Sequence, residues 1–310
     1  ALLAATHLFT PQAAIAAEPL HIVVPYGGGG MIDAIVRMLA EKMAVELNQP
    51  VVVDNKPGAN GIIGSQFVAS AKPDGLTILA GGTGPVSLNA MLRKNLPYSV
   101  DSFAPVAMLF DGPLSVTVPA KLGINSMKEF ESYGAKKGAP VSYGTMGPGS
   151  VTHLFGLLLS KETKLKMRDV AYRNNPSSLV DLISGQVDLS FATPIALVKH
   201  MEANEVKVLA LTTKERSSKF PDIPTLTELG YPMVASFWTG FLAPKGTPKA
   251  EVERIAKAAV NAMNDPKISE FLSVRGLNPK AGGPQAMAAQ LDEDAKVWGK
   301  TIKEEGLSLE

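Results

Sequence analysis

The sequence contains no cysteine, and this absence removes several kinds of chemistry at once. A chain without cysteine has no disulfide framework, no thiolate nucleophile and no cysteine-based zinc site. Charge is sparse and balanced as well, because 30 Lys and Arg residues are scattered among 29 Asp and Glu residues, for a formal net charge of +1. Nucleic-acid-binding proteins usually carry a concentrated basic surface, so we expect no nucleic-acid partner.

Histidine and long apolar runs are also scarce. His7, His21, His153 and His200 lie far apart in the sequence, and none forms the H-x-x-x-H spacing of a helical metal site. No stretch beyond the N-terminal segment reaches the roughly 18 uninterrupted apolar residues of a transmembrane helix. The sequence therefore predicts no metal site and no membrane span.

Apolar residues are what the sequence has in quantity. They make up 45% of the chain against 19% charged residues, which suits a folded protein with a substantial core. The length of 310 residues exceeds that of an ordinary single domain, about 100–200 residues. We therefore expect two lobes.

The first 17 residues form an apolar stretch that ends in an A-x-A pattern at Ala14-Ile15-Ala16. This pattern is typical of the second half of a secretory signal peptide, and the alternative is a buried N-terminal helix. Pro11 and the change to the polar Glu18 favour export. We predict a signal peptide remnant at 1–17 and, because an exported chain without disulfides fits a bacterial periplasm, a periplasmic location.

Short β-branched runs alternate with amphipathic stretches along most of the chain, the pattern of an α/β fold with a parallel sheet flanked by helices. A first series has strands at 21–25, 51–54 and 77–80 and helices at 31–48, 61–71 and 86–93. A second series has strands at 141–143, 169–172, 189–191 and 207–212 and helices at 126–137, 151–162, 177–184 and 195–202.

The C-terminal part has a strand-like stretch at 237–242, and two further helices are indicated by apolar faces at 252–263 and 287–302. We expect these helices to pack on the first lobe, because no strands remain with which they could build a sheet of their own. The first lobe is then discontinuous, 18–118 plus 240–310, and the second lobe is 119–239. Two chain crossings would form a hinge, near 116–120 and 237–243, with a ligand cleft between the lobes.

The strongest local signal is a strand that runs into Tyr26, four consecutive glycines and then a helix. Such a glycine run suggests close approach of the backbone to a ligand, and the N–H groups of a helix N-terminus attract anions. A flexible turn is the alternative. We predict a structural role for Asp33, which balances the helix dipole or pairs with Arg37, rather than ligand binding. The candidate ligand-binding residues here are Tyr26, Gly27, Gly28, Gly29, Gly30, Met31 and Ile32.

Nucleotide sites do not fit this loop. A G-x-G-x-x-G pattern that starts at Gly27 or Gly28 would need glycine at Ile32 or Asp33, and Gly299-Lys300-Thr301 lacks the upstream glycine of a P-loop. We therefore predict no cofactor.

A second glycine-containing loop, residues 143–153, lies within the second series and also leads from a strand into a helix. Ser150 is also a natural N-cap residue, which is compatible with ligand contact. A serine-hydrolase elbow does not fit, because G-x-S-x-G would need glycine at Pro148 and Thr152. The candidate ligand-binding residues of this loop are Thr145, Gly147, Gly149, Ser150 and His153.

Thr83 and Asn89 follow the third strand of the first series. Ligands of open α/β sheets collect at the carboxyl ends of the strands, so both residues are candidates for ligand contact. For Asn89 a position on the exposed surface of a helix is the alternative.

Several stretches, taken together and in this order, resemble the Bug family of periplasmic binding proteins, the TctC-like receptors of tripartite tricarboxylate transporters. The resemblance covers nearly the whole chain after the N-terminal segment. The matching stretches are Pro25-Tyr26, Gly29-Gly30, Asp33, Arg37, 53–61, 73–77, Tyr143-Gly144, Gly147, Gly149-Ser150, His153-Leu154, 185–188, Arg216, 221–225, 228–230, 237–240, Ala243-Pro244 and 246–248.

The resemblance implies a two-lobed periplasmic binding protein type II fold that closes on its ligand, with a mixed or parallel sheet in each lobe. It also implies that backbone groups and ordered water hold a carboxylate, with contacts from the loops around Thr83, Thr145–Ser150, Tyr172 and Phe191–Thr193. Members of the family bind di- and tricarboxylates, acidic amino acids or aromatic acids and deliver them to membrane subunits. A monomer is expected on the same basis.

Two departures from the family pattern concern the ligand. Ile32, preceded by Met31, stands where the family commonly has a hydroxyl residue before the loop aspartate, which favours a flatter or more apolar acid than citrate unless both side chains point into the core. Tyr172-Arg173-Asn174 replaces Tyr-Lys-Gly, and we predict that Arg173 pairs with a distal carboxylate or faces water.

Two other classes of function use the same scaffold. An α/β enzyme, a hydrolase or transferase acting on small carboxylates, would need a nucleophile with a base, a metal or a cofactor, and the sequence shows none of these constellations. A sensor that presents its ligand to a membrane kinase would use the same cleft. The resemblance favours the transport receptor, which is not an enzyme.

Overall fold

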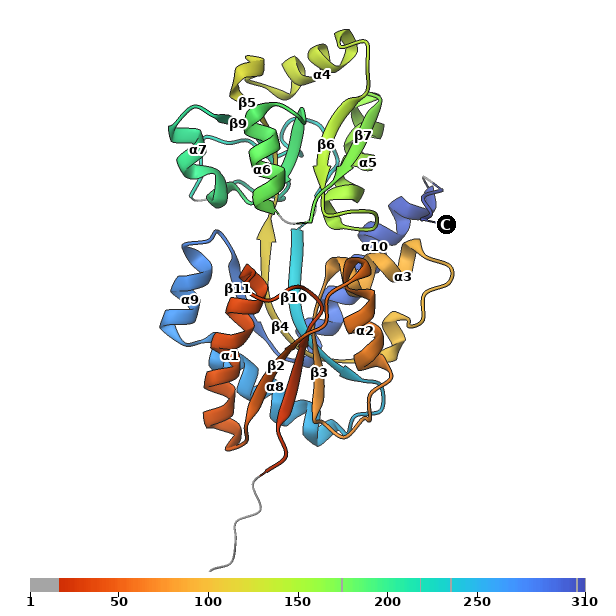
Figure 1. Ribbon diagram of the computed structural model, residues 1–310, viewed down its shortest axis with the longest axis vertical. Helices are drawn as coiled ribbons and strands as arrows, with labels where there is room; N and C mark the ends of the chain where they lie inside the picture. Colours follow the sequence, from red (N-terminus) through yellow and green to blue (C-terminus); the bar gives the residue numbers. More distant parts are fainter. Residues whose placement is uncertain (1–16, 174, 218, 235, 305, 310) are drawn as a thin grey trace, which may run out of the picture.

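The computed structural model describes residues 17–310 except 174, 218, 235, 305 and 310. Within this part the chain forms two mixed β-sheets flanked by helices, arranged one above the other along the long axis (Figure 1). The predicted α/β architecture with two sheets is confirmed. All but the last residue of the predicted signal segment, 1–17, lies outside the described residues.

The first sheet has the strand order β11-β4-β10-β3-β1-β2. β1 (Leu20–Val24) runs parallel to β2 and β3, and four of its five side chains have no exposed surface, so its apolar run matches a central strand. β10 runs antiparallel to β3. The other elements are β2 (Val51–Asn55), β3 (Thr77–Gly82), β4 (Phe103–Pro113), β10 (Ser236–Pro244), β11 (Asn278–Gly282), α1 (Met31–Leu47), η1 (Ala59–Gly61), α2 (Ile62–Ala69), η2 (Thr83–Leu88), α3 (Asn89–Leu92) and η3 (Val100–Ser102).

The second sheet has the strand order β7-β6-β8-β5-β9. β6 runs parallel to β7 and β8, whereas β5 runs antiparallel to β8 and β9. Its elements are β5 (Ser115–Pro119), β6 (Val141–Thr145), β7 (Met167–Ala171), β8 (Leu189–Ala192), β9 (Val206–Leu211), η4 (Ala120–Leu122), α4 (Met127–Lys136), α5 (Val151–Thr163), α6 (Asn175–Ser184), η5 (Pro194–Leu197) and α7 (Val198–Glu202).

The chain passes from the first sheet to the second at Leu114, between β4 and β5. There the N–H of Leu114 donates to Thr212 Oγ1 (3.0 Å), and the N–H of Thr212 donates to the Leu114 carbonyl (2.9 Å), so the end of β9 is tied to this crossing. The return passage, 212–235, leads into β10, which pairs only with strands of the first sheet in the described part of the chain. The lobe boundaries proposed from the sequence stay a prediction.

The C-terminal helices cover the first sheet, as expected. The two predicted helices are α8 (Lys249–Met263) and α10 (Pro284–Glu304), and α9 (Pro266–Ser273) is a further helix that was not predicted. α8 packs against α1 and β4, and α10 packs against β4. The far end of α10 also reaches the second sheet's core, where the Trp298 ring meets the Phe155 ring edge to face at 5.6 Å. α10 therefore belongs to the first sheet but helps to join the two.

Three strands were not predicted, β4, β5 and β11, and β5 lies where the sequence predicts only a chain crossing. β4 contains Pro105, Gly112 and Pro113, residues that usually interrupt strands, yet it lies between β10 and β11. β11 contains Pro279 and Gly282 and pairs at the edge of the sheet. Among the residues that the structure describes, no helix is both long and apolar enough to span a membrane.

Candidate functional site

The first candidate loop joins the carboxyl end of β1 to the N-terminus of α1, as the sequence predicts. Gly29 has a φ of +79°, a conformation that favours glycine, and Gly30 is the extended N-cap residue. A β-carbon on Gly27 or Gly29 would meet no atom within 4 Å. The loop therefore lies against open space.

Asp33 fixes the shape of this loop. Its buried carboxylate accepts hydrogen bonds from the Gly29 N–H (2.9 Å), from Arg37 Nε (3.1 Å) and from Asn55 Nδ2 (2.9 Å). Burial by itself would raise the pKa of Asp33, but the hydrogen bonds from Arg37, Gly29 and Asn55 lower it below its ordinary value. The predicted pairing of Asp33 with Arg37 is confirmed.

The backbone N–H groups at the start of α1 are the donors that remain. In the described part of the chain no hydrogen bond is made by the N–H of Gly27, Gly28, Gly30, Met31 or Ile32. These groups lie at the positive end of a 17-residue helix, where an anion is favoured. The Met31 and Ile32 side chains are partly buried and pack against the core of the first sheet. Part of each side chain is therefore turned away from the loop.

The second candidate loop joins β6 to α5 with the same construction. Gly147 and Gly149 have φ values of +92° and +82°, and Ser150 is the N-cap residue, whose Oγ accepts a hydrogen bond from the His153 N–H (3.2 Å). A β-carbon on Gly147 would meet no atom within 4 Å, so this loop also borders open space. The predicted N-cap role of Ser150 is confirmed.

Hydroxyl groups hold the second loop from inside. Thr145 Oγ1 accepts a hydrogen bond from the Gly147 N–H (3.1 Å), and Thr152 Oγ1 accepts one from the Met146 N–H (3.0 Å). Thr145 and Thr152 are both buried. Two threonines therefore shape this loop, as Asp33 shapes the first.

His153 lies behind the second loop and is nearly buried. Burial lowers the pKa of His153, while the Asp169 carboxylate opposes the shift. The neutral ring accepts a long hydrogen bond at Nδ1 from the Gly149 N–H (3.4 Å). His153 thus contributes to the position of the loop.

Tyr26 and Thr83 follow the carboxyl ends of the neighbouring strands β1 and β3. Thr83 is buried at the carboxyl end of β3, and its Oγ1 accepts a hydrogen bond from the Trp238 N–H (2.9 Å). Tyr26 is half-buried, and burial, with Tyr98 nearby, raises its pKa well above the ordinary value. The Tyr26 hydroxyl therefore stays protonated and available as a donor.

Asn89 has no exposed surface, so its alternative position on a helix surface is excluded. Its Nδ2 donates to the Asn60 carbonyl oxygen (3.1 Å). A β-carbon placed on Gly149, in the other lobe, would lie 3.1 Å from Asn89 Oδ1. The structure therefore brings two predicted residues from different sheets together, with Asn60, which was not predicted.

The residues expected after β7 have mixed surroundings. The Tyr172 hydroxyl donates to Asp181 Oδ2 (2.8 Å), and burial together with this carboxylate raises the pKa of Tyr172 to about 12. The N–H of Tyr172 donates to the Thr145 carbonyl (2.8 Å), which ties it to the second loop. Arg173 is exposed beside it.

The residues expected at the end of β8 also differ from each other. The Phe191 ring is buried, with its centroid 5.5 Å from that of Phe155 and 6.2 Å from that of Tyr143, so its side chain belongs to the core. Thr193 is half-buried and precedes η5. Ligand contact by all these residues stays a prediction.

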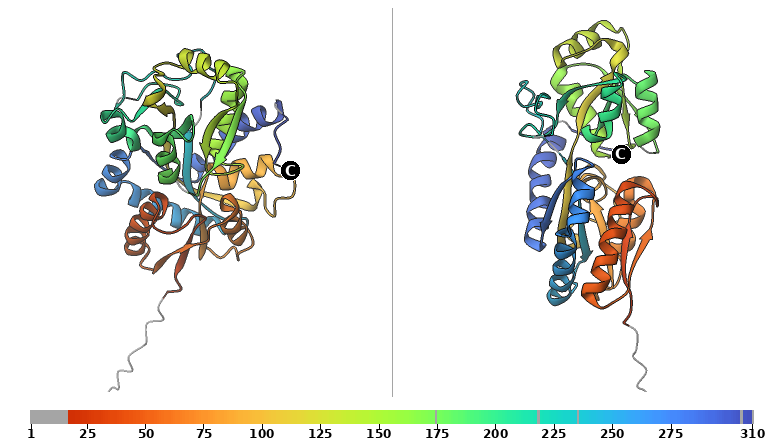
Figure 2. Two further views of the ribbon diagram at one scale, coloured as in Figure 1. Left: turned by 45° about the horizontal axis from the view of Figure 1, so that its top comes forward. Right: turned by 90° about the vertical axis from the view of Figure 1, so that its left-hand side faces the viewer.

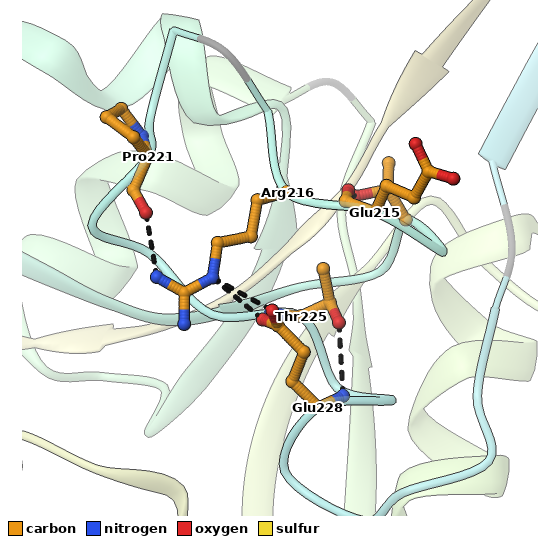
Figure 3. Close-up of polar contacts among 6 residues, drawn as sticks. Glu215, Arg216, Pro221, Thr225 and Glu228 are labelled. Atoms are coloured by element: carbon orange, nitrogen blue, oxygen red, sulfur yellow. Dashed lines mark hydrogen bonds and ion pairs between the residues drawn. The ribbon is translucent and has the colours of Figure 1, made fainter.

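The stretch from Arg216 to Glu228 forms a clasp within the return passage. Arg216 Nε donates to both carboxylate oxygens of Glu228 (3.0 and 2.9 Å), and its NH1 donates to the Pro221 carbonyl (2.8 Å) (Figure 3). The Glu228 N–H donates to Thr225 Oγ1 (3.1 Å). These hydrogen bonds give the family-like residues Arg216, 221–225 and 228–230 a structural role, because they hold the return passage in its folded shape.

A cavity of about 380 Å³ lies beside the clasp. Ile195 and Thr213 line it from the second sheet's side, and Gly276 and Asn278 line it from the first. Figure 2 (right) shows the return passage, in teal, on the opposite edge of the molecule from α1, in red. None of the predicted ligand-binding residues borders this cavity.

A metal centre has no basis in the described residues, where no group of three or more His, Cys, Asp or Glu side chains is placed to hold an ion. The polar groups available at the two loops are backbone N–H groups and hydroxyls at the N-termini of α1 and α5. These groups bind anions, and they provide no nucleophile paired with a base.

Comparison with known families agrees with this chemistry. The model of the tripartite tricarboxylate transporter family receptor, TctC, matches residues 35–307. The chain belongs to the TctC family. This match confirms the resemblance found in the sequence. TctC proteins are solute-binding proteins and not enzymes.

Relatives of this TctC protein match over nearly their whole length. A UPF0065 protein of Bordetella pertussis is 31% identical over 94% of this chain and 90% of its own. Protein BugT of the same organism is 29% identical over 99% of this chain and 98% of its own.

Solved structures share the fold closely. The periplasmic binding protein BugD is 32% identical with a TM-score of 0.82, over 94% of this chain and 98% of its own. MatC from Rhodopseudomonas palustris with bound malate is 28% identical with a TM-score of 0.82, over 93% and 99%. A second R. palustris protein, solved with adipate, is 28% identical with the same TM-score, over 94% and 98%. The predicted periplasmic binding protein type II fold is confirmed.

Proposed function

We propose that this chain is a periplasmic receptor that captures a small organic carboxylate between its two glycine loops and delivers it to the membrane subunits of a tripartite transporter. The observation that carries the proposal is the set of N–H groups of Gly27, Gly28, Gly30, Met31 and Ile32, which have no acceptor in the described part of the chain and lie at a helix N-terminus that borders open space. A carboxylate placed there would accept several of these N–H groups directly or through water.

The second loop would complete the grip. Gly147 borders open space from the other sheet, and its loop starts α5, a second helix N-terminus. A ligand held by both loops gains contacts that exist only when the lobes are together, so it shifts the population toward the closed form. The two lobes would then rotate about the crossing at Leu114 and the return passage, with β5 moving with the second sheet and β10 with the first.

For the ligand we propose a dicarboxylate. The structures solved with malate and with adipate both hold molecules with two carboxylates. In this chain the first loop would take one carboxylate, and the exposed Arg173 beside Tyr172 would pair with the other. The chain would act as a monomer in the periplasm after removal of 1–17, with no nucleic-acid partner.

A thermal-shift panel tests the proposal. It should contain aliphatic dicarboxylates from three to seven carbons, citrate, acidic amino acids and aromatic acids, each also as its uncharged amide. A ligand present at 100 times its Kd stabilises the folded form by about 2.7 kcal/mol. We expect at least one dicarboxylate to raise the Tm and its diamide to have no effect; a panel with no active acid would overturn the proposal.

The first loop can be tested by filling the space before α1. Gly27 needs no left-handed conformation and has no atom within 4 Å of its β-carbon position, so Gly27→Val should fold normally and obstruct the anion. We expect binding to weaken by more than about tenfold, or 1.4 kcal/mol. Gly283→Val is the control, because Gly283 also needs no left-handed conformation and has only Gln285 Oε1, at 4.0 Å, near its β-carbon position, but it lies before α10. Equal affinities of the two variants would contradict the assignment of the first loop.

A further inference from the structure

Four consecutive residues before α2 have positive φ angles. Gly58 and Gly61 have values of +133° and +83°, and between them Ala59 and Asn60 have +47° and +52°. Residues other than glycine rarely adopt positive φ, and two such residues in a row persist only where the surrounding structure holds them. Asn tolerates this conformation better than most residues and Ala does not, so Ala59 is the residue that the surroundings have to hold.

What the strained segment achieves is a reciprocal amide contact. Asn60 Nδ2 donates to Asn89 Oδ1 (3.3 Å), and Asn89 Nδ2 donates to the Asn60 carbonyl (3.1 Å). Asn89 Nδ2 is also 3.5 Å from the Tyr98 hydroxyl, which in turn donates to the Pro85 carbonyl. The pair is thus anchored to η2 of the first lobe and has a single defined geometry.

Gly149 of the second lobe is seated on this pair. A β-carbon at Gly149 would lie 3.1 Å from Asn89 Oδ1, 3.5 Å from Asn60 Nδ2 and 2.9 Å from Leu309 Cδ1. Gly149 is buried, and the Leu309 N–H donates to the Leu92 carbonyl (3.1 Å), which fixes the third side of the seat. A side chain at Gly149 would require Leu309 and Asn89 to move, and the φ of +82° at Gly149 favours glycine as well.

From this geometry we infer that the Asn60–Asn89 pair is a positioning seat for Gly149. It sets where the second loop stands relative to the first, so the affinity for a carboxylate depends on Asn60 although Asn60 does not touch the ligand. The inference rests on the proposed function, since it assigns the lobe register that carboxylate binding between the loops requires. Gly149 and Asn89, predicted as ligand contacts, act here as parts of the seat.

The position of Gly149 within the second loop explains why the seat would affect binding. Gly149 lies between Gly147, which borders open space, and Ser150, which caps α5. A shift of Gly149 relative to Asn89 would therefore move the N-terminus of α5 away from the first loop. Since a bridging ligand has a fixed length, a displacement of this kind removes contacts at one of its ends.

Asn60→Gly is the test variant, because glycine relieves the strained backbone and deletes the amide. Asn204→Gly is the matched control, since Asn204 has a φ of +53° in an exposed turn after α7. Both changes favour the same backbone conformation, so a role in loop shape alone predicts the same result for both. Neither variant is expected to unfold the protein.

Two measurements are made on each full-length variant. The first is the Kd for the best dicarboxylate from the thermal-shift panel. The second is the distance between the lobes, from paired spin labels at Glu41→Cys on α1 and Val180→Cys on α6, both exposed, in a chain that has no native cysteine. We expect Asn60→Gly to weaken binding about tenfold and to broaden the ligand-free distance distribution, with Asn204→Gly like the wild type.

The seat is overturned if Asn60→Gly matches Asn204→Gly in either the Kd or the distance distribution, because a seat must affect both. If the wild type binds no carboxylate, the proposed function fails instead. The distance distributions then decide the seat by themselves: a broader distribution in Asn60→Gly supports it, and an unchanged one overturns it.

Discussion

At the scale of single residues, three buried carboxylates in this protein have different surroundings. Asp33 and Asp188 are surrounded by donors: Asp188 accepts hydrogen bonds from the Tyr133 hydroxyl (2.6 Å) and from both the N–H and the hydroxyl of Ser142 (2.7 Å each), and it pairs with Lys137. Burial opposes ionisation of Asp188, but the bonds from Lys137, Tyr133 and Ser142 lower its pKa. The Asp188 network ties α4 to β6 and explains the 185–188 pattern structurally.

Asp294 on α10 is the opposite case and gives a pH dependence. Burial raises its pKa from 3.8 to about 6, although Trp238 Nε1 (2.7 Å) and Gln290 Nε2 (3.1 Å) donate to it. Because the folded pKa lies above the unfolded one, the stability linked to this proton is fully present below pH 3.8 and is lost as the pH rises through about 6. We therefore expect Asp294→Asn to gain stability over the wild type as the pH rises from about 4 to 7.

Thermal unfolding of both proteins across this pH range measures the effect. The neighbouring Asp292→Asn, at an exposed position of the same helix, is the control and should follow the wild type at every pH. A constant difference in Tm between Asp294→Asn and the wild type would contradict the assignment.

At the scale of secondary-structure elements, the helix N-termini divide into capped and uncapped ones. Ser126 caps α4 and Ser150 caps α5, each by accepting a backbone N–H at 3.2 Å, whereas α1 begins at Gly30 without a side-chain cap. An uncapped N-terminus keeps its donors for another acceptor. The missing cap is not unique to α1, because α2 and α8 also start without one; what marks the proposed anion site is that its free donors border open space.

The two serine caps provide a matched pair of variants. Ser126→Ala and Ser150→Ala should each lose about 1 kcal/mol of stability, because each removes one N-cap. Only Ser150→Ala should also weaken carboxylate binding, since α4 begins away from both glycine loops. The free energy of unfolding in urea and the Kd for the same dicarboxylate measure the two effects. Equal Kd values would show that the cap of α5 has no part in binding.

At the scale of the whole molecule, an apolar core continues across the junction of the two sheets. Trp298 and Ile302 of α10 and Leu92 of α3 share a buried cluster with Leu154 and Phe155 of α5. The lobes are therefore joined by packing as well as by the two chain passages. Any closing motion has to preserve this contact or slide along it.

This continuity predicts cooperative unfolding of the two lobes. We expect the wild type to show one calorimetric transition, and Trp298→Ala to separate it into two, because the variant loses the ring that packs on Phe155. Truncation of a buried tryptophan costs about 3–5 kcal/mol. Trp238→Ala is the control, since Trp238 is equally buried but packs within the first lobe. It should lower the Tm and keep a single transition; the same number of transitions in both variants would argue against coupling by α10.

The sequence by itself determined the architecture and the two glycine loops. The alternation of apolar strands with amphipathic helices follows from burial on one or both faces, and Gly29, Gly147 and Gly149 are needed where the backbone turns into positive φ. The pairing of Asp33 with Arg37 was also predictable, because a spacing of four residues places both side chains on one face of a helix.

Only the tertiary structure decided the contacts between distant segments. β4 and β11 contain proline and glycine and became strands because their neighbours in the sheet offered hydrogen bonds, which local propensity does not record. The contact of Gly149 with Asn60 and Asn89 joins residues far apart in sequence. Such a contact depends on how two lobes are placed, and that placement follows from packing of the whole chain, which no local pattern encodes.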